Sequence, residues 1–337
     1  MSTIKDVARV ANVSIATVSR VVNKGPKVSD KTRERVLQVM QELGYSPNIN
    51  ARDLVTQKNT TIGVVIPDLS DPFFASLASG VDKIARDNNM QLLLSTALLT
   101  EESEREAINL LIERRCQAII IHSKMLKDDE LISLCKRVPG LVLIDRLIDE
   151  ISHKCIWIDN EEGGKLAARH LLALGHTEFA CINSNYLIDD PKLRFKGFEQ
   201  ALLDEHLKID DALHIKAEPT LLGGELATKE LLSIGINNVS AIFVYNDAMA
   251  IGVISTLEDQ GIHVPEHISI IGFDDVLLSR YSRPKLSTLN YPIQQMAQQA
   301  ALLSLDLIDK QSPLYEIKAQ HCYVPRLVQR ESTSKKS

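Results

Sequence analysis

The sequence predicts an α/β protein in which a small all-α module precedes two doubly wound lobes, each built on a parallel sheet. The chain has 337 residues, enough for about two domains and a small extra module. Apolar residues recur at helical spacing up to residue 45, and from residue 60 short apolar strands alternate with helices. The composition, 45% hydrophobic and 24% charged, is average for a globular protein and excludes a disordered or low-complexity chain.

The N-terminal part contains the pattern of three short helices. Thr3, Ser14 and Ser29 are placed to cap three successive helices, and Gly44 ends the third. Each helix has apolar residues on one face, and two helices joined by a tight turn and braced by a third form a helix-turn-helix module. We therefore expect this module at residues 1–46, followed by a polar hinge segment at 47–58 that need not fold by itself.

Charge is distributed unevenly along the chain. Residues 1–58 hold ten Lys and Arg against five Asp and Glu, a net charge of +5, whereas the remainder carries −11 and the whole chain −6. A basic head on an acidic body is typical of a module that binds a polyanion. On charge alone, a solvated basic terminus is the alternative.

Continuous apolar runs of four or five residues predict the strands of the two lobes, because such runs suit parallel strands that are buried on both faces. The expected strands are residues 62–66, 92–94, 118–121 and 141–144, then 179–182, 214–217, 241–245 and 268–273. The N-terminal lobe is expected at 59–161 with 291–320, and the C-terminal lobe at 162–290 with 321–337. Ligands of such sheets bind beyond the carboxyl ends of the strands, so we expect a site in the cleft between the lobes.

Polar side chains follow many of these strands. They are Asp68, Asp71, His122, Asp145 and Arg146 in the first lobe, and residues 183–185, Asn246, Asp247, Asp274 and Asp275 in the second. Carboxylates and amides pair with hydroxyls, and an aromatic ring such as Phe73 or Phe74 covers the apolar side of a sugar. The pattern predicts a polyhydroxylated ligand, with a loop or capping role as the alternative for any single Asp.

Motifs for catalysis and for metal binding are incomplete. Gly163-Gly164-Lys165-Leu166 resembles the end of a phosphate loop but lacks a Ser or Thr after the Lys, and we expect it to begin a helix. His263 and His267 have ligand spacing, but Pro265 breaks the helix that would present them. We therefore expect no enzyme activity, no metal and no cofactor.

The sequence also indicates the compartment. Five scattered cysteines without a C-x-x-C pair suit a reducing environment. The apolar stretches are too short to span a bilayer, and the N-terminus lacks the apolar core of a signal peptide. A cytoplasmic protein without membrane contact is the expectation.

Two N-terminal segments closely resemble the DNA-binding headpiece of the lactose/galactose repressor (LacI/GalR) family. They read Ile4-Lys5-Asp6-Val7-Ala8 and Val13-Ser14-Ile15-Ala16-Thr17-Val18-Ser19-Arg20-Val21-Val22-Asn23. Residues 44–48 and 50–54 resemble the family's hinge, and residues 70–74, 245–250 and 271–275 extend the likeness to about Arg330. Residues 122–125 and 274–281 most resemble the galactose-responsive repressors. The resemblance implies a core like that of periplasmic binding proteins.

For DNA binding, the resemblance implies that the second helix enters the major groove of an operator. Ile15 and Ala16 would meet thymine methyls, Arg20 would bind guanine, and Leu54 would wedge into the minor groove. Core packing is the alternative for Ile15 and Leu54. The implied DNA-binding residues are Thr3, Ser14, Ile15, Ala16, Thr17, Ser19, Arg20, Asn23, Asn48, Ala51 and Leu54.

For the effector, the resemblance implies a sugar, D-galactose, in the cleft. The implied contacts are Phe73, Phe74, His122, Asp145, Arg194, Asn246 and Asp274. For Arg194, a surface salt bridge is the alternative. The aromatic residue that the family places near residues 219–222 is missing from this sequence.

The implied function is repression of galactose transport and metabolism genes by a homodimer that binds a palindromic operator in the nucleoid and is released by galactose. No apolar heptad follows Arg330, so we expect a dimer rather than a coiled-coil tetramer. Another sugar, or a corepressor, stays open as the effector. A sugar-binding transport receptor and a sugar-modifying enzyme are the rival classes.

Overall fold

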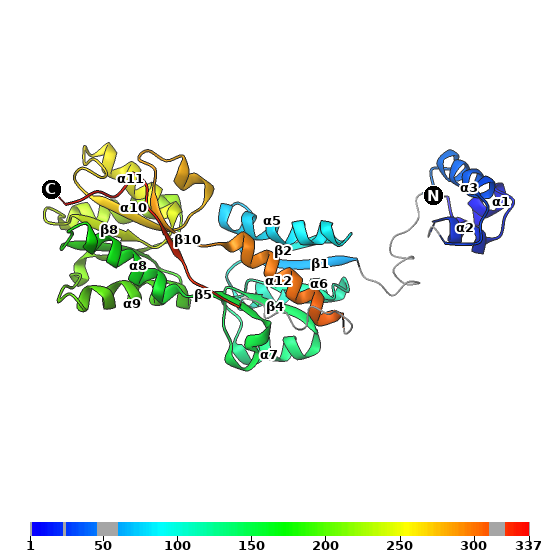
Figure 1. The fold of residues 1–337 in the computed structure, drawn as a ribbon, viewed down its shortest axis with the longest axis horizontal. Coiled ribbons are helices and arrows are strands. Elements are labelled where there is room, and N and C mark those ends of the chain that lie inside the picture. Colours follow the sequence, from blue (N-terminus) through cyan, green and yellow to red (C-terminus); the bar gives the residue numbers. More distant parts are fainter. Residues whose placement is uncertain (1, 23–24, 46–59, 310–320, 337) are drawn as a thin grey trace. The chain divides into compact units, whose positions relative to one another are not determined.

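The computed structural model describes residues 2–22, 25–45, 60–309 and 321–336. The chain divides into two compact units, Met1–Thr60 and Thr61–Ser337 (Figure 1), which are described separately. The expected hinge segment lies outside the described residues, as do Asn23, Asn48, Ala51 and Leu54. Among the helices that the structure describes, none has the length and apolar character needed to cross a membrane.

The described part of the first unit contains three helices, as predicted. Its helices are α1 (Ile4–Val10), α2 (Ile15–Val22) and α3 (Asp30–Glu42). Thr3 and Asp6 form a reciprocal capping box at the start of α1, and the hydroxyl of Ser29 accepts a hydrogen bond from the backbone N–H of Thr32. Gly44 ends the third helix with φ +59°, a conformation that favours glycine. The small core is formed by Val7, Ala8, Ala11, Val18, Val21, Val36 and Val39.

The second unit contains two lobes. The sheet of the first lobe has the order β11-β5-β4-β3-β1-β2, with all neighbours parallel. Its strands are β1 (Thr61–Ile66), β2 (Gln91–Thr96), β3 (Ala118–Ile121), β4 (Gly140–Ile144), β5 (Cys155–Ile158) and β11 (Cys322–Tyr323). Its helices are α5 (Pro72–Asp87), α6 (Glu101–Glu113), α7 (Asp128–Arg137), α12 (Ile293–Ile308) and the 3-10 helix η1 (Asp149–Lys154).

The second lobe repeats the arrangement with the order β12-β10-β9-β8-β6-β7, in which only β12 pairs antiparallel. Its strands are β6 (Phe179–Ser184), β7 (His214–Ala217), β8 (Ala241–Val244), β9 (Ser269–Asp274), β10 (Ser287–Asn290) and β12 (Arg326–Val328). Its helices are α8 (Asn160–Ala173), α9 (Asp189–Leu203), α10 (Leu221–Ile234), α11 (Asp247–Asp259), η2 (Asp211–Leu213) and η3 (Leu277–Arg280).

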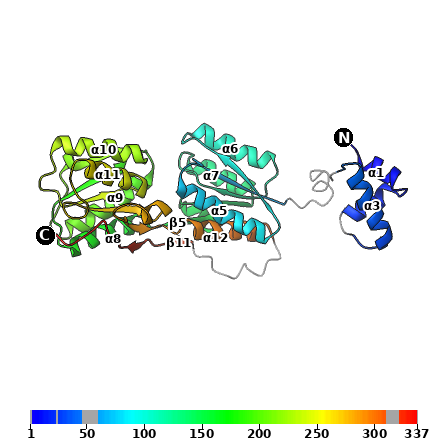
Figure 2. The same ribbon diagram turned by 90° about the horizontal axis from the view of Figure 1, so that it is seen from above.

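Helices cover both faces of each sheet, as expected of doubly wound lobes (Figure 2). In the first lobe, α5 and α12 pack on one face and α6 and α7 on the other. In the second lobe, α8 and α9 oppose α10 and α11. One buried cluster continues from α5 and α12 into α8 and α9, so the two lobes share a core.

The chain crosses between the lobes three times, after β5, after β10 and after β11. The third crossing differs from the expected boundary at residue 320, because Cys322 and Tyr323 still pair with β5 of the first sheet. The sequence-based strand set also omitted β5, β10, β11 and β12. β11 and β12 are two and three residues long and β10 is largely polar, so the apolar signal of these three strands is weak. β5 is an apolar run of four residues, and its sequence did carry the signal.

Candidate functional site

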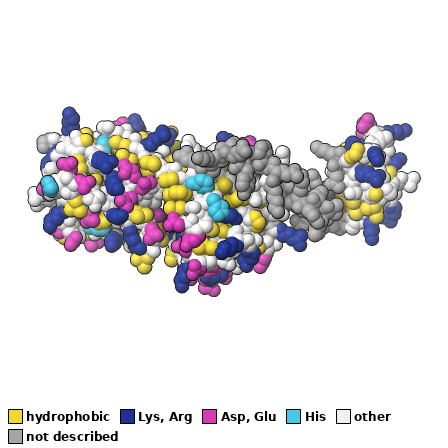
Figure 3. Space-filling model, turned by 60° about the horizontal axis from the view of Figure 1, so that its bottom comes forward, with side chains coloured by type: hydrophobic (Ala, Val, Ile, Leu, Met, Phe, Trp, Pro, Cys, Tyr) yellow, Lys and Arg dark blue, Asp and Glu magenta, His cyan; other side chains and the backbone are white. Residues whose placement is uncertain are grey.

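The helix α2 presents an exposed face on the first unit. Ile15 is 45% exposed, which excludes core packing for this residue, and Ala16 and Arg20 are exposed beside it. The hydroxyl of Ser14 accepts a hydrogen bond from the backbone N–H of Thr17 (3.1 Å) and so caps the helix. Figure 3 shows Lys and Arg side chains distributed over the visible face of this unit. Such a face suits the predicted contact with DNA.

The other predicted DNA contacts are partly engaged within the module. Thr3 is exposed and pairs through its hydroxyl with the carboxylate of Asp6 (2.7 Å), and Ser19 is half-buried. Thr3 and Ser14 therefore each cap a helix, whatever further role they have. The other predicted contacts, Asn23, Asn48, Ala51 and Leu54, cannot be placed because they lie outside the described residues.

A cavity of about 150 Å³, called here the inner cavity, lies between the two lobes of the second unit. Side chains from loops after β1, β3 and β4 of the first lobe and after β6, β8 and β9 of the second lobe line it. All seven residues predicted to contact an effector are among them: Phe73, Phe74, His122, Asp145, Arg194, Asn246 and Asp274. Their convergence matches the geometric expectation for doubly wound lobes, and their roles in binding stay a prediction.

Arg194 of α9 is held rigidly at one wall. Its Nε donates to Asn160 (2.9 Å), its Nη1 donates to the carbonyl of Tyr245 (2.8 Å), and its guanidinium lies 3.7 Å from the centre of the Phe273 ring. Nη1 also lies 3.4 Å from Asp274 Oδ1. This burial excludes a surface salt bridge and prepares a fixed donor group at the cavity.

Asp274 stands at the end of β9 with an unusual backbone conformation and a shifted pKa. Its φ of +109° is rare for a residue other than glycine. Burial, which Arg194 only partly offsets, raises the pKa of Asp274 well above its ordinary value. A carboxyl group of this kind can donate as well as accept hydrogen bonds.

His122 provides an unpaired acceptor or donor atom. Its Nε2 lies 3.2 Å from Asp145 Oδ2, whereas its Nδ1 is buried without a hydrogen-bond partner in the described part of the chain. Because a carboxylate only accepts, Nε2 carries the proton in the neutral imidazole, and Nδ1 is left as an acceptor. A buried polar atom without a hydrogen-bond partner destabilises the protein by about 1–3 kcal/mol. A ligand hydroxyl that donates to Nδ1 would remove this penalty and so favour binding.

The carboxylate of Asp145 already has three protein partners. Tyr291 donates its hydroxyl to Oδ1, and Lys124 Nζ lies 2.8 Å from Oδ2, beside His122. Although burial opposes ionisation, Lys124 and His122 hold the pKa of Asp145 below its ordinary value. The structure thus places Asp145 at the cavity wall with two protein partners at Oδ2 and one at Oδ1, as a residue that orients its neighbours.

Asn246 and the two phenylalanines also have local contacts. Asn246 caps α11 through Met249 N–H (2.9 Å) and donates to the carbonyl of Pro219 (3.1 Å). Phe74 meets the ring of His122 edge-on at 4.9 Å, and Phe73 is buried against the core. Each side chain lines the cavity while it stabilises the wall.

Some residues of the site were missed by sequence reasoning. Lys124, Tyr186, Asp190 and Tyr245 also line the cavity. Lys124 follows a predicted strand, as His122 does, and this position in the sequence could have identified it as a cavity residue. Tyr186 and Tyr245 are the aromatic residues of this set.

Other strand-end residues turn away from the cavity. Asn183 donates to the carbonyl of Pro191 (3.1 Å), Asp247 accepts from Thr288 (2.6 Å), and Asp275 pairs with Arg330. Gly163 and Gly164 lie in the first turns of α8, which confirms that this motif begins a helix. His263 and His267 lie in a loop, and among the described residues no cluster of His, Cys, Asp or Glu is suited to a metal ion.

Comparisons with known proteins agree with this architecture. Residues 3–48 match the family described as bacterial regulatory proteins, lacI family, and residues 168–333 match the periplasmic binding protein-like domain. The HTH-type transcriptional regulator GalR of Escherichia coli (strain K12) is 46% identical over 99% of this chain and 96% of its own. The regulator GalS of Salmonella typhimurium (strain LT2) is 42% identical, over 99% and 97%.

A solved structure shows the same fold. The crystal structure of the lac repressor dimer bound to operator and the anti-inducer ONPF aligns with a TM-score of 0.84, at 28% identity, over 99% of both chains. These relatives are named as transcriptional regulators and not as enzymes. The chain belongs to the LacI family of bacterial regulatory proteins, and it is a DNA-binding transcriptional regulator with a two-lobed core of the sugar-binding type.

Proposed function

We propose that this protein is a cytoplasmic repressor that binds a palindromic operator as a homodimer and releases it when D-galactose occupies the inner cavity. The observation that supports a sugar site is that all seven residues predicted to contact the effector line one cavity between the lobes. Its volume of about 150 Å³ is below the roughly 300–1,000 Å³ typical of pockets for drug-sized ligands, and so favours a monosaccharide. The likeness to GalR and GalS favours galactose among the sugars.

At the DNA, Ile15 and Ala16 read thymine methyl groups, and Arg20 reads guanine through its two parallel donors. Their exposure on α2 supports these roles. Ser14, Thr17, Ser19 and Thr3 position the module on phosphates, as capped helix ends commonly do. Asn23, Asn48, Ala51 and Leu54 complete the interface, with Leu54 in the minor groove.

The homodimer is supported by an apolar surface on the second lobe. Leu222 and Leu226 of α10 are 61% and 55% exposed, and Leu277 and Tyr281 near η3 are 63% and 70% exposed. Both α10 and η3 pack against the same helix, α11. An exposed apolar surface of this kind marks an interface, and a two-fold axis through it would give each half of a palindrome one DNA-binding module.

In the cavity, Arg194, Asn246 and Asp274 from the second lobe and His122 from the first bind sugar hydroxyls, while Phe74 covers an apolar face of the ring and Phe73 supports it. Asp145 acts by orienting His122. The sugar bridges the lobes and favours the lobe arrangement with low operator affinity. A coupling of about 1–3 kcal/mol is typical of such effects.

The test is fluorescence anisotropy of a labelled duplex that carries a palindromic operator of galactose genes, at fixed salt concentration. Tight binding that D-galactose weakens, and that ribose does not, supports the proposal. Binding that galactose strengthens would replace the inducer by a corepressor. Operator affinity that does not change with galactose would overturn the proposal that galactose is the effector. Equal affinity for a scrambled duplex would overturn the proposal that the protein recognises this operator.

A further inference from the structure

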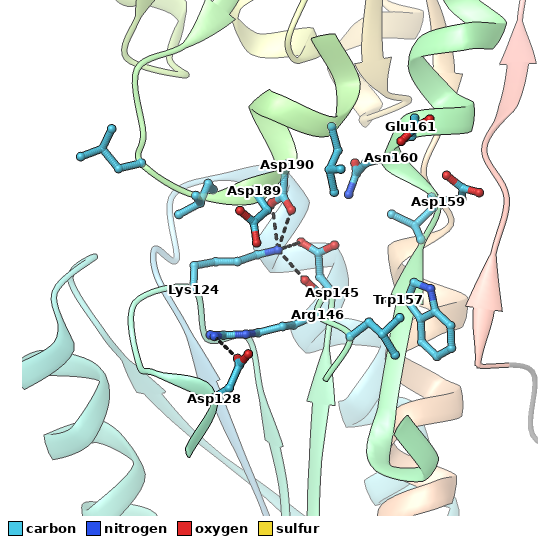
Figure 4. A pocket seen from close by; sticks show the side chains of 15 residues that line it. Lys124, Asp128, Asp145, Arg146, Trp157, Asp159, Asn160, Glu161, Asp189 and Asp190 are labelled. Atoms are coloured by element: carbon cyan, nitrogen blue, oxygen red, sulfur yellow. Dashed lines mark hydrogen bonds and ion pairs between the residues drawn. The ribbon is translucent and has the colours of Figure 1, made fainter. Parts of the chain in front are cut away.

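A second cavity, of about 480 Å³, adjoins the inner cavity. We call it the outer cavity; its walls include Arg146, Trp157, Asp159 and Asn160 (Figure 4). The two cavities share four lining residues: Lys124, Asp145, Ile188 and Asp190. A thin partition of side chains therefore separates a monosaccharide-sized site from a space about three times as large.

Lys124 is the centre of this partition. Its Nζ lies 2.8 Å from Oδ2 of Asp145 in the first lobe and 2.8 Å from Oδ2 of Asp190 in the second, and the side chain is only 6% exposed. It also donates to the backbone carbonyl of Asp145. Figure 4 shows the side chain extended across the cleft, with its ammonium group between the two carboxylates.

The ammonium group has no donor left for an effector. Lysine has three N–H donors, and the three acceptors here are the two carboxylates and one carbonyl. Burial disfavours the charged form, but Asp145 and Asp190 keep the pKa of Lys124 above its ordinary value. Lys124 is thus fixed as a wall and is not available as a ligand for sugar hydroxyls.

The loop that carries Lys124 is also fixed. The buried carboxylate of Glu104 on α6 accepts hydrogen bonds from the Ser123 hydroxyl and from the backbone N–H groups of Lys124, Met125 and Leu126. With four bonds to one carboxylate, this loop resists displacement by a larger ligand.

We propose that Lys124 determines effector size: its side chain closes the inner cavity to any sugar longer than a monosaccharide, and its removal joins the two cavities. This inference rests on the proposed function, because it assumes that a sugar binds in the inner cavity. A galactose carrying a bulky substituent on the carbon that faces Lys124 would then extend into the outer cavity and reach Trp157.

The chain provides its own probe, because Trp157 is its single tryptophan and lines the outer cavity. Nitrophenyl groups quench indole fluorescence at short range. We would compare the wild-type protein with the double variant Lys124→Ala/Asp190→Asn, in which the second change avoids two unpaired carboxylates. Lys127→Ala is the matched control, since Lys127 is exposed in the same region and makes no capping bond.

The ligands are D-galactose, both anomers of p-nitrophenyl galactoside, and galactose with a nitrobenzyl group on O6. We expect the double variant to bind at least one derivative about tenfold more tightly than the wild type, a gain of about 1.4 kcal/mol, with quenching of Trp157. The Lys127→Ala control should match the wild type. Thermal unfolding checks that each variant is folded.

Two results would overturn the inference. In the first, the double variant binds galactose but gains no affinity for any derivative. In the second, the wild-type protein already binds a derivative as tightly as galactose. Failure of the wild-type protein to bind galactose at all is a separate result, which overturns the proposed function. The operator assay detects it, because galactose would then leave operator binding unchanged.

Discussion

Glu104→Gln is predicted to lower the free energy of unfolding of the second unit, and the size of the loss can be worked out from the hydrogen bonds of Glu104. Glu104 is 2% exposed, and its Oε1 accepts from the N–H groups of Lys124 (2.9 Å) and Met125 (3.1 Å). Its Oε2 accepts from the N–H of Leu126 (3.1 Å) and from the Ser123 hydroxyl. In glutamine, one of these oxygens becomes an NH₂ group.

The remaining amide oxygen can keep the bonds of Lys124 and Met125 as neutral bonds, and the Ser123 hydroxyl can reverse and accept. The Leu126 N–H would face an NH₂ group and would lose its acceptor. A hydrogen bond to a charged group contributes about 1.5–3 kcal/mol, and a neutral one about 1 kcal/mol. One lost charged bond and the weakening of the others together give about 3 kcal/mol.

Urea unfolding followed by circular dichroism measures this change as a shift of the midpoint at constant slope. Since 1 kcal/mol lowers the Tm of a domain of this size by roughly 2–4 °C, the melting temperature should fall by about 6–12 °C. Glu106→Gln is the control, because Glu106 is exposed on the same helix. A loss below about 0.5 kcal/mol, equal to an ordinary surface substitution, would refute the role of Glu104.

Three further outcomes are expected. Arg20→Ala should weaken specific operator binding by about 1–3 kcal/mol and lower the discrimination against a scrambled duplex, as anisotropy at fixed salt would show; an unchanged ratio would contradict guanine recognition. Burial raises the pKa of Asp247 to about 7, so the unfolded chain ionises it first, and the free energy of unfolding should fall by about 3 kcal/mol as pH rises from 4 to 7. Asp247→Asn should flatten that pH dependence in urea titrations, and an unchanged slope would count against the assignment. Gly164→Ala would place a Cβ 2.0 Å from the carbonyl oxygen of Arg194, so it should cost about 1–3 kcal/mol and weaken galactose binding measured by calorimetry, unless α8 and α9 can separate freely.

Much of the fold could be predicted because the local signals are strong. The caps at Thr3, Ser14 and Ser29 and the glycine at Gly44 define the first three helices. The strands that were predicted are buried runs such as 118–121, where all four residues are fully buried. Strands such as β11 and β12 are fixed by pairing with distant strands, and no local pattern marks them.

The site could be predicted only as far as strand ends and the family resemblance reach. These signals found the residues around the inner cavity, but not the pairing of Lys124 with Asp190. These two residues are 66 positions apart and come from different lobes, so their contact depends on how the lobes pack. Asp247 and Asp275 show that a strand end alone does not place a residue at the cavity. Both follow strands, yet their carboxylates bind groups within the second lobe.

Asp145 shows how a residue predicted from its place at a strand end can have contacts that the sequence does not reveal. Its backbone has φ +61°, a strained conformation that costs about 1–3 kcal/mol in a residue other than glycine. That conformation turns one carboxylate toward three groups at once: His122 at the inner cavity, Lys124 at the partition, and Tyr291 at the crossing after β10. A ligand that satisfies Nδ1 of His122 therefore acts on Asp145 through the other ring nitrogen. Asp145 in turn pairs with Lys124, and Lys124 also pairs with Asp190 of the second lobe. The hydrogen bonds of the site and the contacts that join the lobes thus form one network. Through this shared carboxylate, the proposed binding of a sugar in the cavity would change how the lobes are arranged.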